Sequence, residues 1–397
     1  MKISRRTAVI SASTFAGAAI LSACGSKDSE PANDASPSAS SGASDSASGS
    51  ASASASPQGP LVTWADNTMV SHLFFHSLVA DPKRAFDGDD EAKGYLDYMV
   101  TIDEFKKIIQ QVYDRNYILI SPHQLYTTGP DGSIELKPLE LPEGKKPLVI
   151  SFDDLSYYEY MDGDGFPDRL IVKDGKIVNE YRDAAGKKQV GAYDHLPIME
   201  EFLQDHPDFS HDGAKGVIAM TGYNGVLGYR TSDISYKDQN KNLDQDKKDA
   251  KKVADAIKNN GWEFASHSWG HINFTKSPVD HIRADNEKWQ AEVAPIVGKT
   301  DLLIYPFGAD IAGIGDYENE KFQYLKSQGF NAFFNVDASV PAWGQAGGKY
   351  LRQARINVDG ISLKHAIEGT SQTLNEFFDP HTVLDPQRPK SISGTDE

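Results

Sequence analysis

The chain has 397 residues, of which 39% are hydrophobic and 10% aromatic, which suffices for one large domain or two ordinary ones and excludes a disordered protein. Its formal net charge of −17 argues against nucleic acid or an anionic membrane surface as the main partner, because both would repel it. The single cysteine, Cys24, excludes intrachain disulfides and cysteine-rich metal sites, so any metal must be bound by His, Asp or Glu.

The N-terminal segment has the pattern of an export signal. Three basic residues precede an apolar stretch, Ala8–Ile20, that is too short to span a membrane. The closing sequence Leu21-Ser22-Ala23-Cys24 resembles a bacterial lipobox. We therefore expect residues 1–23 to be a signal peptide and Cys24 to carry a lipid anchor on the extracellular face of the cytoplasmic membrane. A plain signal peptide is the alternative, and both the general and the twin-arginine export routes stay open.

Residues 24–60 are dominated by serine and alanine, with several prolines. Such a segment cannot bury enough apolar surface to offset its ordering entropy, so we expect a flexible tether. The folded domain is predicted over residues 61–385, followed by a tail at 386–397.

From residue 61 onward, short apolar runs alternate with amphipathic stretches. Strands are predicted at 72–79, 117–120, 148–152, 216–220, 262–265, 302–305, 330–336 and 350–358, and helices at 101–112, 249–259, 282–296 and 319–328. Thr101 and Glu104 form a capping-box pattern at the first helix. This alternation indicates a parallel sheet or a β/α barrel, and seven or eight strands favour the barrel, whose chemistry lies at the C-terminal ends of the strands.

Residues 155–195 interrupt this alternation. Two β-type runs at 170–172 and 176–178 flank Asp174-Gly175, which predicts a hairpin inserted next to the presumed site. The acidic run 162–168 resembles part of a calcium loop. It lacks the closing acid at EF-hand spacing, so our interpretation is a solvated acidic turn.

Asp153 and Asp154 directly follow a buried strand. Adjacent side chains at a strand end point to different sides, so one carboxylate can bind a metal while the other acts as a base. An ordinary strand-end turn is the alternative.

The segment His267-Ser268-Trp269-Gly270-His271 offers two histidines at i and i+4. This spacing places both on one face of a helical turn, within reach of one metal ion, although two surface histidines would show it too. Two imidazoles and a carboxylate leave a position open for water, as in catalytic zinc sites. Tyr305-Pro306-Phe307-Gly308 ends a third strand, and its Pro and Gly favour a tight turn that could bring a backbone N–H toward a ligand.

Together these segments resemble the polysaccharide deacetylase family, also called the NodB homology or carbohydrate esterase family 4. Residues 151–154 (Ser-Phe-Asp-Asp) are similar to its first motif, and residues 267–271 to its His-Ser/Thr-x-x-His motif. Residues 305–308 and Phe75-His76-Ser77-Leu78 resemble motifs of the branch that deacetylates poly-N-acetylglucosamine. The motifs follow the family's order over roughly residues 70 to 360.

The resemblance implies a distorted β/α barrel in which Asp154, His267 and His271 bind a divalent metal, with Zn²⁺ expected first and other divalent transition metals as alternatives. It also implies that Asp153 is the general base. The oxyanion is expected to bind the metal and a backbone N–H near Tyr305. Residues expected at the substrate or its oxyanion are Trp269, Tyr305, Pro306, Phe307 and Gly308.

The sequence departs from the family's pattern at two places. Leu302, Leu303 and Ile304 fill the stretch where the family has an arginine that orients the base, and Arg355 is our candidate substitute, with a surface arginine as the alternative. The family's late histidine motif is spelled by Leu363-Lys364-His365, but Ser362 reads as the start of a helix there. We therefore prefer His76 as the further site histidine, with a core histidine as the alternative.

The predicted function is hydrolysis of N-acetyl groups on extracellular or cell-wall glycans, of peptidoglycan or poly-N-acetylglucosamine type, by a monomer. A surface glycan-binding lipoprotein with little turnover is the alternative, and O-acetyl esters or non-sugar amides are further substrates that the motif residues do not distinguish. Four aromatic residues could stack on sugar rings or belong to the core: Trp64, Trp269, Trp343 and Tyr223.

Overall fold

The computed structural model describes residues 59–392. Cys24, the predicted signal peptide 1–23, nearly all of the predicted tether and the last five residues lie outside this range. None of the helices in this range combines the length and the apolar character that a membrane span requires.

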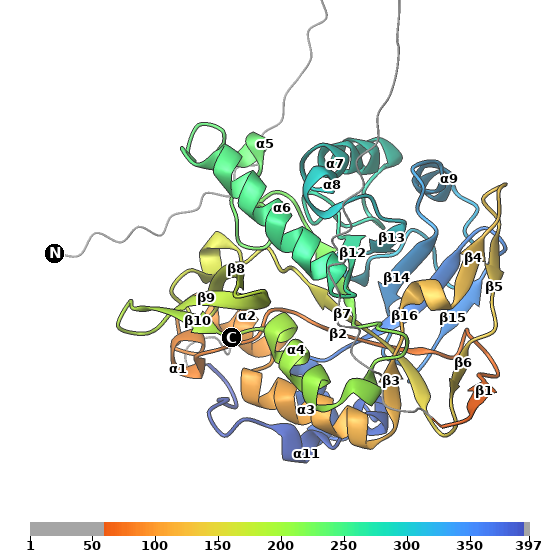
Figure 1. Ribbon diagram of the computed structural model, residues 1–397, viewed down its shortest axis with the longest axis horizontal. Helices are drawn as coiled ribbons and strands as arrows, with labels where there is room; N and C mark the ends of the chain where they lie inside the picture. Colours follow the sequence, from red (N-terminus) through yellow and green to blue (C-terminus); the bar gives the residue numbers. More distant parts are fainter. Residues whose placement is uncertain (1–58, 393–397) are drawn as a thin grey trace, which may run out of the picture. The chain divides into compact units, whose positions relative to one another are not determined.

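Seven parallel strands close into a barrel, following one another around the ring in chain order (Figure 1). Each pairs in parallel with the next, and the last pairs with the first. The α/β barrel predicted from the sequence is confirmed. Its strands are β2 (Ser71–Phe75), β7 (Lys146–Asp153), β11 (Val217–Met220), β12 (Glu263–Ser266), β13 (Leu302–Ile304), β14 (Ala332–Val336) and β16 (Leu351–Asn357).

Shorter strands extend the barrel at its margins. The predicted strand 117–120 forms β3 (Tyr117–Leu119), which pairs with the start of β7 outside the ring, and β15 (Gly344–Ala346) pairs antiparallel with β16. Two small antiparallel pairs complete this side: β1 (Leu61–Thr63) with β6 (Glu140–Pro142), and β4 (Tyr126–Thr128) with β5 (Ile134–Leu136).

Helices surround the strands (Figure 1). The predicted first helix is α3 (Ile102–Asp114); its capping box between Thr101 and Glu104 is present. The prediction of one helix over 282–296 is wrong, because Pro295 cannot continue a helix and the segment divides into α7 (Val279–Glu292) and α8 (Ala294–Val297). The other α-helices are α1 (Pro82–Ala85), α2 (Ala92–Tyr98), α4 (His195–Asp205), α5 (Asp233–Tyr236), α6 (Leu243–Asn259), α9 (Glu320–Ser327), α10 (Gly360–Ile367) and α11 (Pro380–Val383), and the 3₁₀ helices are η1 (Pro122–Gln124), η2 (Glu159–Met161), η3 (Pro207–Phe209), η4 (Pro306–Gly308) and η5 (Thr373–Glu376).

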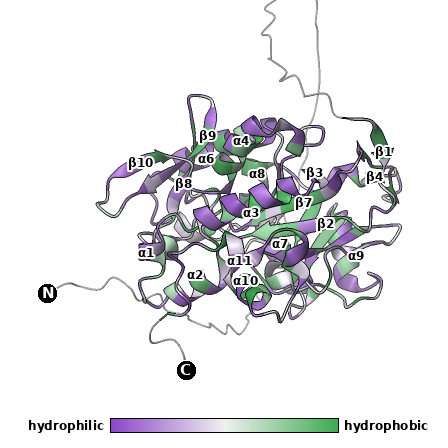
Figure 2. Ribbon diagram, turned by 90° about the horizontal axis from the view of Figure 1, so that it is seen from below, coloured by the Kyte–Doolittle hydropathy of each residue, from purple (hydrophilic) through white to green (hydrophobic). Residues whose placement is uncertain are grey.

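The barrel strands carry continuous apolar runs, visible as hydrophobic colour on β2 and β7 in Figure 2. A parallel strand that is buried on both faces needs such a run. One apolar cluster, which includes Val149, Ala219 and Phe334, draws on alternate strand positions, and a larger cluster joins the opposite strand faces to the helices. The core thus has two layers, one on each side of the barrel wall.

Polar side chains interrupt the apolar packing toward the carboxyl end of the barrel. His72 bonds to Gln353 and to Ser151, both at 2.9 Å, and Arg355 donates to Ser151 at 3.2 Å. Burial lowers the pKa of His72 to about 3, and the nearby charge of Arg355 adds to this effect, so the ring is neutral at physiological pH. This buried network leads from the barrel strands to the site residues described below.

The predicted hairpin is confirmed as β8 (Pro167–Lys173) and β9 (Lys176–Arg182), joined at Asp174 and Gly175, both with positive φ. A third strand, β10 (Lys188–Gly191), pairs with β9. The interpretation of residues 162–168 as a solvated turn is wrong for Asp164, which is 4% exposed, accepts a hydrogen bond from the Tyr95 hydroxyl and lies near Asp89 and Glu91.

Two predicted boundaries differ from the structure. The strand predicted to reach Val79 ends at Phe75, so His76 follows the strand end directly. The tail predicted from residue 386 is part of the domain as far as the structure describes it, because Arg388 bonds to the buried carboxylate of Glu104 at 2.6 Å and Ile392 is buried.

A charged cluster lies at the amino-terminal ends of β12 and β13. His123 bonds to Glu263 at 3.0 Å and to Asp301 at 2.8 Å, and the Tyr126 hydroxyl donates to Asp301. Burial disfavours a charged His123, but the hydrogen bonds and charges of the two carboxylates outweigh burial and raise its pKa to about 10. The cluster therefore contains a protonated imidazole at neutral pH.

Candidate metal centre and its cavity

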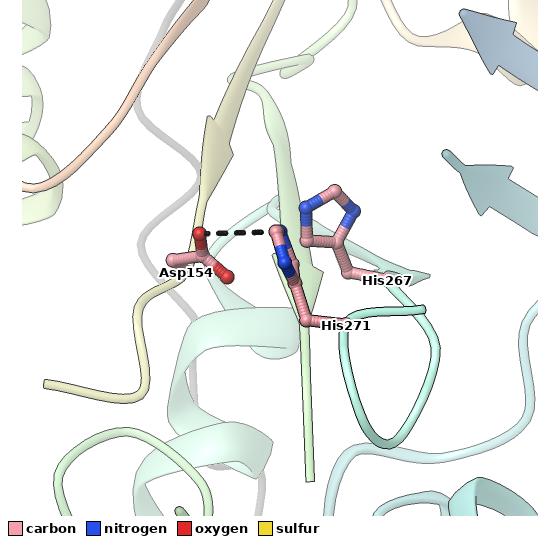
Figure 3. A group of neighbouring side chains, drawn as sticks. All are labelled: Asp154, His267 and His271. Carbon is pink, nitrogen blue, oxygen red and sulfur yellow. Dashed lines mark ion pairs between the residues drawn. The ribbon is translucent and has the colours of Figure 1, made fainter. Parts of the chain in front are cut away.

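Asp154, His267 and His271 converge from the ends of β7 and β12 (Figure 3). Their ligand atoms all lie within 4.8 Å of one another, and His271 Nε2 is 3.8 Å from Asp154 Oδ2. Asp154 has a φ of 63° and donates its backbone N–H to the Ala219 carbonyl. This left-handed conformation turns the chain at the strand end and lets Asp153 and Asp154 take different directions.

The two histidines do not share a helical turn, contrary to the prediction from their spacing. Ser268 and His271 have φ values of 57° and 51°, so the segment is a bent loop that directs both rings to one side. Asp285 of α7 fixes this loop by accepting hydrogen bonds from the backbone N–H groups of Trp269 and Gly270, at 2.7 and 2.8 Å. A carboxylate remote in sequence therefore sets the local backbone.

Two of the three ligands, His267 and Asp154, are oriented by a hydrogen bond at their other polar atom. His267 Nδ1 donates to the Ile304 carbonyl at 2.8 Å, which leaves Nε2 for the centre. Burial lowers the pKa of His267 to about 4, so the ring is in the neutral form that binds metals. The Tyr158 hydroxyl donates to Asp154. Two imidazoles and one carboxylate, of which His267 and Asp154 are held from behind, fit a divalent cation.

Asp153 lies beside this centre in a buried ion pair with Arg355. Arg355 Nη1 donates to the two oxygens of Asp153 at 2.7 and 2.9 Å, and Asp153 Oδ2 is 3.8 Å from His267 Nε2. Burial by itself would raise the pKa of Asp153, but the charge and hydrogen bonds of Arg355 outweigh it and hold the value at about 2. Arg355 is 1% exposed, which rules out the alternative of a surface arginine.

Only part of the segment Tyr305–Gly308 lines the cavity. Tyr305 and Pro306 are buried away from it, whereas Phe307 and Gly308 line it, with φ values of 59° and 62°. The expectation that the Tyr305 and Pro306 side chains contact substrate is therefore wrong. The Tyr305 N–H donates to the Phe334 carbonyl, so it is not available to an oxyanion. Within residues 305–309, the backbone N–H of Phe307 has no acceptor in the described structure.

Trp269 does not line the cavity, contrary to our expectation. Its Nε1 donates to Glu292 at 2.7 Å, and Lys288 lies over its ring. The other three proposed stacking residues do not line it either: Trp64 packs on a core cluster, Trp343 lies under Arg352, and Tyr223 stacks on Tyr158.

His76 lines the cavity, and His365 does not. His76 Nδ1 bonds to the Tyr98 carbonyl at 3.1 Å, and this hydrogen bond does not involve Nε2. His365 is exposed on α10, whose N-cap is Asp359 rather than the predicted Ser362. The interpretation of this region as a helix is confirmed, so its histidine motif does not form part of the site.

The cavity has a volume of about 530 Å³, within the range of small-molecule sites. Besides the residues above, α2 and η2 contribute Tyr98 and Tyr160 to its wall. Sequence reasoning missed both tyrosines, because neither belongs to a motif and Tyr98 falls at a helix end where a surface residue is expected.

One family model matches part of the chain. Residues 235–333 match the family model of polysaccharide deacetylase. This segment contains His267, His271 and residues 305–308, and it supports the resemblance drawn from the sequence. It does not include Asp153, Asp154 or Arg355, and it does not bear on the poly-N-acetylglucosamine branch.

Two solved structures are distantly similar. The Streptococcus pyogenes deacetylase PplD in complex with acetate has 14% identity and a TM-score of 0.43, over 79% of this chain and 99% of that one. A polysaccharide deacetylase from Bacillus cereus has 14% identity and a TM-score of 0.38, over 75% and 69%. No curated protein matches the chain.

Proposed function

We propose that this protein is a metal-dependent deacetylase that hydrolyses N-acetyl groups on extracellular or cell-wall glycans. The observation that carries the proposal is the juxtaposition of Asp154, His267 and His271 with the ion pair of Asp153 and Arg355 in one cavity. The family match over residues 235–333 supports the same chemistry.

The proposed cofactor is a divalent cation, with Zn²⁺ first because a site of two histidines and one carboxylate suits it. The chemistry that such an ion supplies when bound is polarisation of a carbonyl and activation of a water molecule. The chain's part at His267 is to keep the imidazole neutral through burial and correctly turned through the Ile304 carbonyl.

Asp153 accepts a proton from the attacking water, since it is ionised and held in place by Arg355. The water oxygen bonds to the acetamide carbon, and the Phe307 N–H donates to the oxyanion that forms. The C–N bond then breaks as the leaving amine takes a proton. We assign that transfer to His76, because it is the histidine of the cavity wall outside the metal triad. The products are acetate and a free amino sugar.

The location of the enzyme is part of the proposal. The signal pattern at residues 1–23 and the lipobox cysteine, Cys24, favour export and a lipid anchor on the extracellular face of the membrane. The net charge of −17 agrees with a neutral or cationic glycan and with no role for nucleic acid. We expect a monomer.

The direct test is acetate release by the full-length chain, loaded with Zn²⁺ or another divalent transition metal. The substrates are peptidoglycan, poly-N-acetylglucosamine and chitooligosaccharides, with an O-acetylated glycan as a separate arm. Asp153→Asn is the matched inactive variant and should lose several powers of ten in rate. Release from none of these glycans by the metal-loaded protein would refute the proposal.

A non-catalytic glycan-binding role is the alternative. Three features favour it: the arginine missing before residue 305, the uncertain general acid and the insertion at 155–195. Arg355 bonds to Asp153, so it can orient that residue in place of the missing arginine. The alternative predicts that Asp153→Asn leaves sugar binding and cellular function intact, whereas the deacetylase proposal predicts that function is lost while binding persists.

A further inference from the structure

The most exposed aromatic side chains in the described part of the chain are gathered at one place. Among the aromatic residues within 59–392, only Tyr98, Tyr160 and Phe307 are half exposed or more, at 52%, 50% and 69%. All three line the cavity of the metal centre. Large aromatic rings are normally buried, so three exposed rings around one cavity indicate a surface that binds a ligand with apolar faces.

Two of these rings lie beyond the reacting centre. Tyr98 is the last residue of α2, and Tyr160 belongs to η2, which precedes the inserted hairpin. The backbone carbonyl of Tyr98 is bonded to His76, which places this wall directly next to the reacting end of the cavity. Tyr160 stacks on Tyr158 with ring centroids 5.4 Å apart. Because Tyr158 bonds to Asp154, the wall is continuous with the metal-binding end.

The charge of the cavity restricts what this wall can receive. Five carboxylates line it: Asp153 and Asp154 at the metal centre, and Asp90, Glu91 and Asp359 elsewhere in its wall. Among the described residues that line it, Arg355 is the one arginine or lysine, and it is committed to Asp153. An acidic sugar would be repelled here, whereas a neutral or amino sugar would not.

Resting on the proposed function, we propose that Tyr98 and Tyr160 form a second sugar subsite, which binds the neutral or amino sugar adjoining the N-acetylated one at the metal centre. The pyranose ring presents a C–H face that packs on an aromatic ring. The substrate class that follows is an oligomer of hexosamines without carboxylate substituents on the adjoining ring. Neither tyrosine contacts the reacting atoms, so both are positioning residues.

Binding can be measured without turnover, using the tetrasaccharide of glucosamine, which has no acetyl group to hydrolyse. Isothermal titration of the full-length chain should show tighter binding of this tetrasaccharide than of glucosamine. Tyr98→Ala and Tyr160→Ala should each weaken tetrasaccharide binding by roughly three- to tenfold, the range of one aromatic contact, and leave the monosaccharide unchanged. Tyr98→Phe and Tyr160→Phe keep the ring and should bind within about twofold of the wild type.

A uronic-acid tetrasaccharide tests the charge argument and should bind more weakly than the glucosamine oligomer, also at high ionic strength. Tyr193→Ala, on a half-buried tyrosine that does not line the cavity, is the control for general effects of removing a ring. Thermal unfolding of each variant shows whether the fold is retained.

Kinetics separate this inference from the proposed function. With N-acetylglucosamine oligomers, the alanine variants should raise KM for the tetrasaccharide and leave kcat nearly unchanged. Equal binding of monomer and tetramer by the wild type, or alanine variants that bind the tetramer as well as the wild type does, would overturn the inference even if acetate is released. Failure to release acetate with the binding pattern intact would instead overturn the proposed function alone.

Discussion

Replacing Arg355 by methionine removes the charge that holds Asp153 ionised and keeps most of the side-chain volume. Arg355 and Asp153 are 1% and 2% exposed, so neither is solvated by water. Arg355 Nη1 contacts both carboxylate oxygens and the Ser151 hydroxyl. In Arg355→Met the carboxylate would remain buried without a cationic partner.

Breaking a buried ion pair from one side costs about 3–5 kcal/mol, because one charge stays buried and uncompensated. The carboxylate can escape part of this cost by taking up a proton. Its pKa, now about 2, would rise above the ordinary value of about 3.9, since burial then acts alone. The double variant Arg355→Met/Asp153→Leu should recover much of the loss, as it removes both charges.

The sign of the pH dependence follows from these pKa values. In the wild type the folded-state pKa of Asp153 lies below its unfolded value, so its contribution to stability is full above about pH 4 and is lost as the pH falls toward 2. In Arg355→Met the folded-state pKa of Asp153 would lie above its unfolded value. The stability difference between the two proteins should therefore be largest at neutral pH and shrink in acid.

Urea unfolding across this pH range measures the stability difference, and the pH profile of kcat/KM for acetate release reports the base. As the pH is lowered, kcat/KM of Arg355→Met should fall at a higher pH than kcat/KM of the wild type does. A loss of less than about 1 kcal/mol at pH 7 with an unchanged pH profile would refute the assignment of Arg355 as the partner of a buried base.

Three further predictions concern other parts of the structure. The pKa of His123, raised to about 10 by its carboxylate partners, makes its contribution to stability full below about pH 6.5 and lost as the pH rises toward 10, so urea unfolding of His123→Gln should converge with that of the wild type at alkaline pH. Tyr158→Phe removes the hydroxyl that holds Asp154 and should weaken divalent-metal affinity by roughly 10- to 100-fold in equilibrium dialysis. Gly308→Ala places a Cβ at 2.5 Å from Val336 in a left-handed backbone, so we expect about 1–3 kcal/mol of destabilisation in thermal unfolding and slower acetate release.

Each of these outcomes has a control. Asn substitution at an exposed histidine such as His365 should leave the alkaline stability profile unchanged, and a persistent gap between His123→Gln and the wild type at pH 10 would contradict the raised pKa. Wild-type metal affinity in Tyr158→Phe would show that the hydroxyl does not orient the ligand. Gly313, which has open space around its Cβ position, should tolerate alanine.

The barrel could be predicted from the sequence because its strands carry their signal locally. A parallel strand that is buried on both faces needs a continuous apolar run, and Leu148–Phe152 ending on two aspartates has that pattern. The strand ends were less predictable. Leu78 and Val79 resume the apolar pattern after His76 and Ser77, but the hydrogen-bonded ladder to β7 stops at Phe75.

The convergence of Asp154, His267 and His271 was also predictable, because these residues lie in two short motifs at the ends of strands. The conformation of the histidine segment was not. Spacing of i and i+4 fits a helical turn, but Asp285 of α7 accepts two backbone hydrogen bonds from the segment and favours a bent loop with positive φ at Ser268 and His271. That contact joins residues 16 positions apart and has no signature in the motif itself.

The surroundings of the triad depend on long-range contacts that a sequence pattern does not show. Arg355 meets Asp153 across 202 positions of the chain, because both side chains face the closed barrel's interior near its carboxyl end. Trp269 lies between His267 and His271 in the sequence, but its ring is directed toward Glu292 and not toward the cavity. Tyr98 and Tyr160 reach the cavity from the end of α2 and from the short helix η2. Secondary-structure propensity does not predict where a side chain points at such positions.

The central claim is that Asp154, His267 and His271 bind one divalent cation. Equilibrium dialysis of the full-length chain against Zn²⁺, with the bound metal determined by elemental analysis, tests it without any assumption about substrate. We predict one tightly bound ion per chain, its loss in His267→Gln and His271→Gln, and its retention in His365→Gln. A folded wild-type protein that takes up no Zn²⁺ or other divalent ion, or one whose bound ion survives both substitutions, would contradict the account.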